Sequence, residues 1–171
     1  YLCVINNPAD DLRLRRIVNV PARKIGAATM DKAQAIATEG GLTLMEVLHR
    51  AGDYPQLKSS TGKLISFTAM IDEMRCQSDE MGLVEFYDYV CRRSGYAAML
   101  QEKEDAESRG RLENVEELSS SIQAFLENDP EEPTLSGFLD EVALYTDLDG
   151  QEAGDNCVTL MTMHSAKGLE F

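Results

Sequence analysis

The sequence predicts a mainly α-helical domain followed by one short β-strand, and three features of its 171 residues support this. Apolar residues recur at intervals of three and four through most of the chain, as they do on the buried face of a helix. Helix-capping and helix-ending residues separate these periodic segments. Hydrophobic residues make up 43% of the chain and charged residues 27%, which is typical of a globular protein with a core. We therefore expect a helical, bundle-like arrangement.

Turn residues divide the first half of the chain into five helices. Asp10 or Asp11 can cap the second helix, and Pro21 stops it. Gly40-Gly41 ends the third helix, because glycine readily adopts the left-handed conformation that closes helices. Thr43 can cap a short fourth helix. The predicted ranges are residues 1–6, a second helix to about residue 19, 27–40, 44–48 and a longer helix over about 62–74.

The second half of the chain predicts three more helices and then a change of periodicity. The helices cover residues 83–91, 102–126 and 135–145, and the longest has an apolar stripe with glutamate on its other faces, which predicts a solvated acidic surface. Residues 146–156 read as an acidic loop. Val158–Met163 has the period of a β-strand. Because a lone strand has nothing to pair with, we expect its sheet partners elsewhere in a larger protein.

Charge is distributed unevenly along the chain. The net charge is −14, yet residues 1–75 carry ten basic and eight acidic side chains, whereas residues 76–171 carry six and twenty-two. Residues 12–30 contain five basic residues and no acidic one. A local basic segment of this kind can contact phosphates even in an acidic protein. The overall charge therefore does not exclude nucleic acid as a partner.

Several classes of protein are disfavoured. No apolar run approaches the ~20 residues that span a bilayer, and the first residues lack the layout of a signal peptide. His49 and His164 stand alone, so no metal site is predicted. We expect a cytoplasmic protein with no membrane partner, whose four separated cysteines are reduced core residues: Cys3, Cys76, Cys91 and Cys157.

Residues 20–33 form a candidate phosphate-binding hairpin between two helices. Gly26 lets another surface approach the backbone, and the free N–H groups of the following helix attract anions. Arg23 and Lys24 add positive charge, and Thr29 offers a hydroxyl group. The predicted contacts to duplex DNA are these four residues and Ile25. An ordinary helix connection with solvated arginines explains the same residues about equally well.

This hairpin resembles the helix-hairpin-helix element of DNA-binding proteins, whose usual core is glycine, an apolar residue and glycine. Lys24 stands at the first glycine of that pattern, followed by Ile25 and Gly26. Because Lys24 replaces this glycine, the close approach of a partner to the backbone is affected on that side of the hairpin, where the lysine can supply a positive point charge instead. Contacts from backbone amides and basic side chains to phosphates carry no base information, so the expected binding is independent of DNA sequence.

The most specific pattern lies in the last fourteen residues, Val158–Phe171. They match T-x-H-x-x-K-G-L-E-F at every position and closely resemble motif V of the superfamily-one DNA helicases related to UvrD, PcrA and Rep. The resemblance implies that Thr162 and His164 contact single-stranded DNA in the parent protein. It also implies that Glu170 binds the ribose of ATP, and that Lys167 and Gly168 shape the turn at the nucleotide site.

The same resemblance extends over nearly the whole chain and implies its domain organisation. Residues 1–8 are expected to end motor domain 2A, residues 9–156 to form the accessory helical subdomain 2B, and residues 157–171 to return into 2A. The parent would be an ATP- and Mg²⁺-dependent helicase that moves 3′ to 5′ and unwinds DNA in repair or replication. In it, 2B contacts the duplex and swings about connections near Asn7 and Asn156, with the remaining motor domains of the same chain as partners.

The chain itself lacks the motifs that hydrolyse ATP. Ser60-Thr61-Gly62-Lys63 looks like the end of a phosphate loop, but leucines replace the first glycine and the metal-binding hydroxyl, and a helix start explains it better. We expect no ATPase or helicase activity and no bound cofactor in the fragment alone. The alternative function is an all-helical protein-interaction module, in which the acidic helix over 102–126 recruits a basic partner. A nuclease fused to the motor, as in some relatives, is compatible with these residues.

Overall fold

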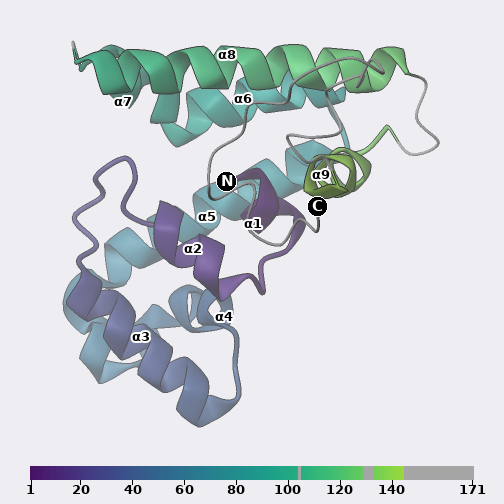
Figure 1. The fold of residues 1–171 in the computed structure, drawn as a ribbon. Helices are drawn as coiled ribbons and strands as arrows, with labels where there is room; N and C mark the ends of the chain where they lie inside the picture. Colours follow the sequence, from purple (N-terminus) through teal and green to yellow (C-terminus); the bar gives the residue numbers. More distant parts are fainter. Residues whose placement is uncertain (104, 129–132, 145–171) are drawn as a thin grey trace, which may run out of the picture.

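The structure is a computed structural model that describes residues 1–103, 105–128 and 133–144. Within these ranges all regular secondary structure is helical (Figure 1), so the prediction of a mainly α-helical chain is confirmed. The predicted strand at 158–163 and the loop at 146–156 lie outside the described residues. The elements are α1 (Leu2–Asn6), α2 (Asp11–Ile17), α3 (Ala27–Gly40), α4 (Leu44–His49), the 3-10 turns η1 (Ala51–Asp53) and η2 (Pro55–Ser60), α5 (Thr61–Ser78), α6 (Leu83–Ser94), α7 (Tyr96–Gln101), α8 (Ala106–Glu127) and α9 (Leu135–Leu144).

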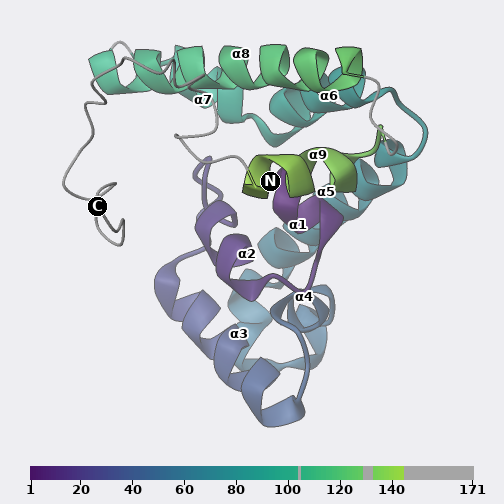
Figure 2. The same cartoon turned by 45° about the vertical axis from the view of Figure 1, so that its right-hand side comes forward.

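Two groups of helices share α5 as a common wall. Helices α2, α3 and α4 surround its first half, and α8 lies across α6 and α7 at the other side of the molecule (Figures 1 and 2). Helices α1 and α9 pack against each other between these groups, and α1 also contacts α5. The two groups therefore form one continuous body around a single core.

The apolar stripe predicted on α5 is confirmed. Leu64, Ile71 and Met74 have no exposed surface, and Phe67 is 1% exposed. Each such side chain contributes about 1.5–3 kcal/mol when it leaves water. The stripe runs along most of α5. Because the hairpin lies beside the first turn of α5 and α1 packs against later turns of the same helix, α5 sets the position of the hairpin relative to α1.

The long helix predicted over residues 102–126 is present as α8, which begins four residues later than predicted. Before it lies α7, a short helix that the sequence analysis missed, and Gly95, in a left-handed conformation with φ +75°, separates α7 from α6. Helix α8 then begins at Ala106, because the Asp105 carboxylate accepts hydrogen bonds from the backbone N–H of Ser108 at 2.8 Å and from its hydroxyl at 2.9 Å. A capping side chain of this kind marks the first turn of a helix rather than its interior.

Helix α8 buries one face and exposes its acidic faces, as predicted. Ile122 and Phe125 are buried, and the Phe125 ring meets the Phe138 ring of α9 edge to face, with centroids 5.5 Å apart. This contact fixes α9 against the end of α8. The exposed side carries three of the glutamates: Glu113, Glu116 and Glu117.

The prediction that the cysteines are core residues is wrong at Cys76. Its side chain is exposed, whereas Cys3 and Cys91 are half-buried, and Cys157 lies outside the described residues. Cys76 follows the last buried position of α5, Met74, by two residues, and this step turns it about 200° away from the apolar stripe. Across the described ranges, no group of His, Cys, Asp and Glu side chains is placed to hold a metal ion. None of the described helices combines the length and apolar character needed to cross a bilayer.

The Asp105 cap predicts a specific acid sensitivity. The backbone N–H of Ser108 lowers the pKa of Asp105 below its ordinary value of 3.8. A carboxyl group whose pKa is lower in the folded state stabilises the fold above the unfolded-state pKa, and this contribution is lost as the pH falls through the folded-state pKa. In thermal unfolding followed by circular dichroism, Asp105→Asn should therefore be less stable than wild type at pH 6, and the difference should shrink below about pH 4. A difference that stays constant down to pH 3 would contradict the cap.

Candidate nucleic-acid interface

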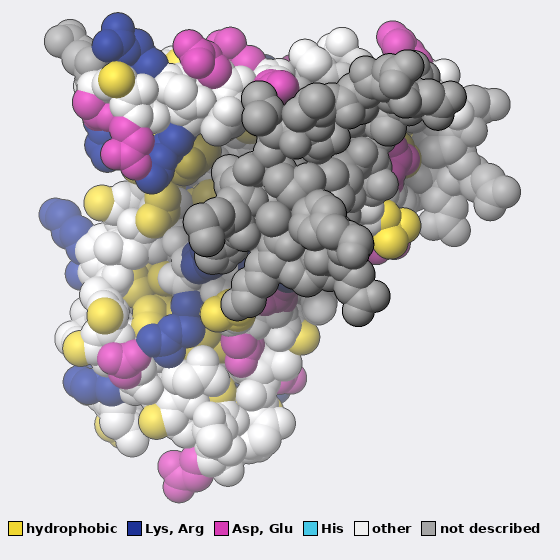
Figure 3. All heavy atoms as spheres, in the orientation of Figure 1, with side chains coloured by type: hydrophobic (Ala, Val, Ile, Leu, Met, Phe, Trp, Pro, Cys, Tyr) yellow, Lys and Arg dark blue, Asp and Glu magenta, His cyan; other side chains and the backbone are white. Residues whose placement is uncertain are grey.

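The predicted hairpin is present and joins α2 to α3 on the side of the molecule where Lys and Arg side chains gather, at the left of Figure 3. Asn19 closes it, because its side-chain oxygen accepts hydrogen bonds from the N–H groups of Arg23 at 2.8 Å and Ile25 at 3.2 Å. The Ile25 side chain is buried in the core and 1% exposed. The Ile25 side chain thus anchors the hairpin to the core. A direct contact between Ile25 and DNA stays a prediction.

The backbone conformation of Lys24 shows why glycine usually occupies this position of the helix-hairpin-helix motif. Its φ is +58°, in the left-handed region that a residue with a Cβ atom enters at a cost of about 1–2 kcal/mol. The turn therefore requires the backbone conformation that glycine provides most easily. Lysine keeps the same backbone path and places an exposed ammonium group at the tip of the hairpin.

Arg23 points into the molecule rather than outward. Its Nη2 donates to the carbonyl oxygen of Ser94 at 2.9 Å and to the Tyr1 hydroxyl at 2.7 Å. The guanidinium carbon lies 5.4 Å from the centre of the Phe67 ring and 5.8 Å from that of Tyr1. Its Nη1 donates to three carbonyl oxygens at 3.1–3.4 Å, those of Ile17, Val18 and Pro21. These contacts make Arg23 a positioning residue, and its direct contact with DNA stays a prediction.

Tyr1 completes this partly buried polar cluster. Its hydroxyl donates to the carbonyl oxygen of Val20 at 2.5 Å while it accepts from Arg23. Burial is the largest effect on this side chain and raises the pKa of Tyr1, which keeps the hydroxyl protonated and able to donate. The hairpin is therefore tied to α1 at one point and to the end of α6 at another.

Gly26 leaves open space through which an external partner can approach the backbone. It begins α3 with φ −81° and ψ 163°, a conformation open to any residue, and a Cβ atom built there would meet nothing within 4 Å. The fold itself therefore does not require glycine. Among the described residues no group accepts a hydrogen bond from the N–H groups of Ala27 and Ala28, which carry the positive end of the 14-residue helix.

The start of α5 lies beside the hairpin. This proximity was not predicted from the sequence. Lys63 Nζ donates to the carbonyl oxygen of Lys24 at 3.2 Å, and the Thr29 hydroxyl lies 3.4 Å from that of Ser60. The Ser60–Lys63 segment is a helix start, as predicted, and its resemblance to a phosphate loop was the available signal. A shallow hollow of about 350 Å³ separates the hairpin from this helix and is lined by Arg23, Gly62, Lys63, Ser66, Phe67 and Met70.

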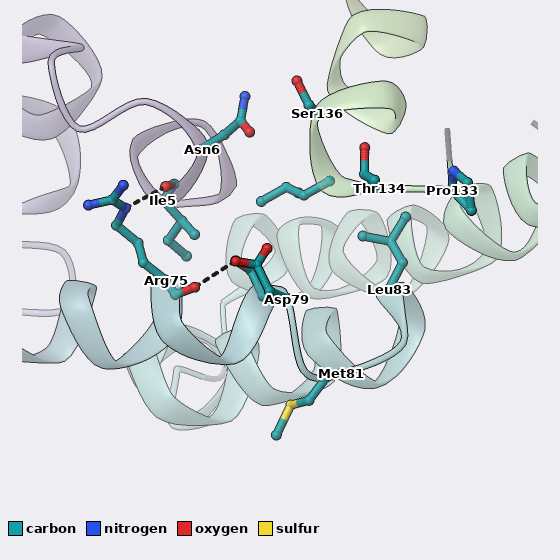
Figure 4. A pocket seen from close by; sticks show the side chains of 11 residues that line it. Ile5, Asn6, Arg75, Asp79, Met81, Leu83, Pro133, Thr134 and Ser136 are labelled. Atoms are coloured by element: carbon teal, nitrogen blue, oxygen red, sulfur yellow. Dashed lines mark hydrogen bonds between the residues drawn. The ribbon is translucent and has the colours of Figure 1, made fainter. Parts of the chain in front are cut away.

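The remaining predicted site residues lie elsewhere. Thr162, His164, Lys167, Gly168 and Glu170 are outside the described residues. A second hollow of about 480 Å³ lies where α1, α9 and the end of α5 meet, and it contains none of the predicted contacts (Figure 4).

Helix α1 belongs to the helical core. Arg75 on α5 donates from Nε to the carbonyl oxygen of Ile5 at 3.1 Å, which holds the end of α1 in place (Figure 4). Val4 is 0% exposed and Ile5 is 3% exposed. The structure therefore packs part of the segment predicted to end domain 2A, residues 1–8, into the helical body. The proposed boundary itself stays a prediction.

Substitution of Arg23 should destabilise the whole fold. Hydrogen bonds from charged groups contribute about 1.5–3 kcal/mol each, and a lysine cannot reproduce the planar fork that reaches both Ser94 and Tyr1. We expect Arg23→Lys to lower the free energy of unfolding in urea by about 2 kcal/mol and Arg23→Ala by about 3–4 kcal/mol. Wild-type stability of Arg23→Lys would show that the guanidinium contacts do not support the hairpin.

Lys24 offers a test of the turn. Lys24→Gly relieves the left-handed strain and should leave the urea midpoint unchanged or raised, because the gain offsets the greater chain entropy of glycine. Lys24→Val should lower the stability by about 1–2 kcal/mol, since a β-branched residue tolerates positive φ poorly. Equal stability of the two variants would contradict the left-handed conformation.

Comparison with known proteins agrees with this architecture. The sequence profile of the family described as UvrD-like helicase C-terminal domain matches residues 1–171. The chain is 41% identical over 172 residues to the ATP-dependent DNA helicase PcrA of Staphylococcus epidermidis, covering 100% of this chain and 24% of that protein. It is 38% identical over 172 residues to PcrA of Staphylococcus aureus, covering 100% of this chain and 23% of that protein.

The chain thus spans about a quarter of the length of the curated relatives it matches. The match extends over the hairpin, the long acidic helix and the motif V segment alike. It confirms the resemblance that the sequence motifs indicated: this chain belongs to the UvrD-like helicase C-terminal domain family.

Proposed function

We propose that this chain is the duplex-contacting accessory part of an ATP-dependent DNA helicase similar to PcrA. The observation that carries the proposal is the exposed edge at the hairpin, where Lys24 and Lys63 flank the open approach at Gly26. Positive side chains, free helix N–H groups and an absent Cβ atom together suit a phosphate group. The chemistry of these groups supports the proposal, and membership of the helicase family is consistent with it.

The hairpin would hold the duplex by its backbone. One phosphate would accept hydrogen bonds from the N–H groups of Ala27 and Ala28, and the two lysine ammonium groups would attract it or its neighbours. Arg23 and Ile25 would position this edge from inside. None of these contacts reads a base, so binding would depend on salt and not on DNA sequence.

The ATP-driven part of the activity belongs to the proposed whole protein. There ATP hydrolysis with Mg²⁺ would supply the energy for 3′-to-5′ movement during repair or replication. Within the described part of the chain no side-chain cluster suits a metal ion. By family resemblance, Thr162 and His164 would contact the single strand, and Lys167, Gly168 and Glu170 would serve the nucleotide site.

The packing of α1 bears on how this part would swing relative to the motor domains. A hinge at Asn7 would pull Val4 and Ile5 out of the core, and burial of two such side chains is worth about 3–6 kcal/mol. That cost is too large for an easy motion. We therefore propose that α1 moves with the helical body instead of hinging at Asn7.

Duplex binding by the 171-residue chain tests the proposal. In fluorescence anisotropy with a labelled blunt duplex at low salt, Lys24→Ala/Lys63→Ala should weaken binding and reduce the slope of log K against log [salt] by about 2, or about 1 for each lost phosphate contact. The matched control, Arg92→Ala/Lys103→Ala, removes the same charge from exposed basic residues away from the hairpin and should bind almost as wild type.

Two results would contradict the proposal. The first is equal loss of duplex binding in the lysine pair and in the control pair, because binding would then follow overall charge. The second is no duplex binding at low salt by the wild-type chain together with binding of a basic polypeptide, which would favour the protein-interaction module centred on α8.

A further inference from the structure

A third hollow, also of about 480 Å³, opens between α2 on one side and α7 and α8 on the other. Among the residues that the structure describes, three arginines and no acidic side chain line it, and the arginines come from two different helices: Arg13 and Arg16 from α2, and Arg111 from α8. In Figure 3, Lys and Arg side chains lie along the hollow between the helices at the top and those beneath them. We call this feature the arginine hollow.

The charges of the arginine hollow are available to a ligand. Arg16 is exposed and has no ion-pair partner within the described part of the chain. Arg13 pairs with Asp10 at 2.5 Å and Arg111 pairs with Glu107 at 2.6 Å. Each pair joins neighbouring turns of its own helix, and the side chains of Arg13 and Arg111 are 57% and 56% exposed. Such pairs contribute little, so a phosphate can replace the carboxylates.

The rest of the wall is aromatic and apolar. Tyr1 and Tyr96 line the hollow, and the hairpin contributes Val20, a large apolar residue that is 40% exposed. A site that combines arginines with tyrosines and apolar surface suits a ligand with both phosphates and flat, unpaired bases. A duplex hides its base faces in the stack and offers only phosphates, so it would use only part of this wall.

We propose that the arginine hollow binds a short segment of single-stranded nucleic acid, with the three arginines on its phosphates and a base against the Tyr96 side of the wall. The inference rests on the proposed function and deepens it. Val20 belongs both to the hairpin and to the hollow, and Arg23 and Tyr1 connect the two through their hydrogen bond. A strand that separates from a duplex held at the hairpin therefore has a binding surface next to it.

The test compares two pairs of arginines in the 171-residue chain. Arg16→Ala/Arg111→Ala removes charge from the hollow, and Arg92→Ala/Arg109→Ala removes the same charge from exposed arginines that do not line it. Anisotropy with labelled dT12 at low salt should show about tenfold weaker binding for the hollow pair and a salt slope reduced by about 1.4, since each single-strand phosphate contact contributes about 0.7. The control pair should stay within about twofold of wild type by the same reasoning, with circular dichroism confirming that all variants are folded.

The outcomes separate this inference from the proposed function. Wild-type dT12 binding by the hollow pair, or equal loss in the control pair, overturns the arginine hollow even where Lys24→Ala/Lys63→Ala still weakens duplex binding. Duplex binding by Lys24→Ala/Lys63→Ala with the affinity and salt slope of wild type overturns the proposed function instead. A poly-glutamate peptide that binds as tightly as dT12, and depends on Arg16 and Arg111, would make the hollow a site for acidic polypeptide and overturn the nucleic-acid assignment.

Discussion

The partly buried guanidinium of Arg23 makes the interactions on which the rest of this structure depends. It connects the hairpin to Tyr1 at the start of the chain and to Ser94 at the end of α6, and it packs over Phe67 of α5. Three segments distant in sequence thus converge on one charged group whose hydrogen bonds are charge-assisted and directional. These contacts fix the inner surface of the hairpin and thereby position its outer surface.

The residues of the hairpin fall into two groups with different roles. The residues that shape it, Asn19, Arg23 and Ile25, face inward or satisfy its backbone. The residues that can meet a partner, Lys24 and Gly26, are exposed between them. A basic residue in a DNA-binding motif is thus not by itself a DNA contact, because a guanidinium with five donors serves equally well to organise carbonyl oxygens.

Local signals made much of this architecture predictable, whereas long-range contacts did not. Caps at Thr43 and Thr134, and the left-handed Gly41, could be recognised because each acts within one helical turn. The inward turn of Arg23 depends on partners 22 and 71 residues away, and the position of Lys63 beside the hairpin on a contact across 39 residues. Nothing in the spacing of residues along the chain reports such convergence. The motif V segment identified the family, although its geometry lies outside the described residues.

The central claim is that a phosphate meets the start of α3, and backbone amide resonances report on it directly. In ¹H–¹⁵N correlation spectra of the 171-residue chain titrated with a short duplex at low salt, the amides of Gly26, Ala27 and Ala28 should shift most, and the shifts should reverse on addition of salt. Unchanged amides at these three residues, with the largest shifts on the acidic face of α8, would contradict the account.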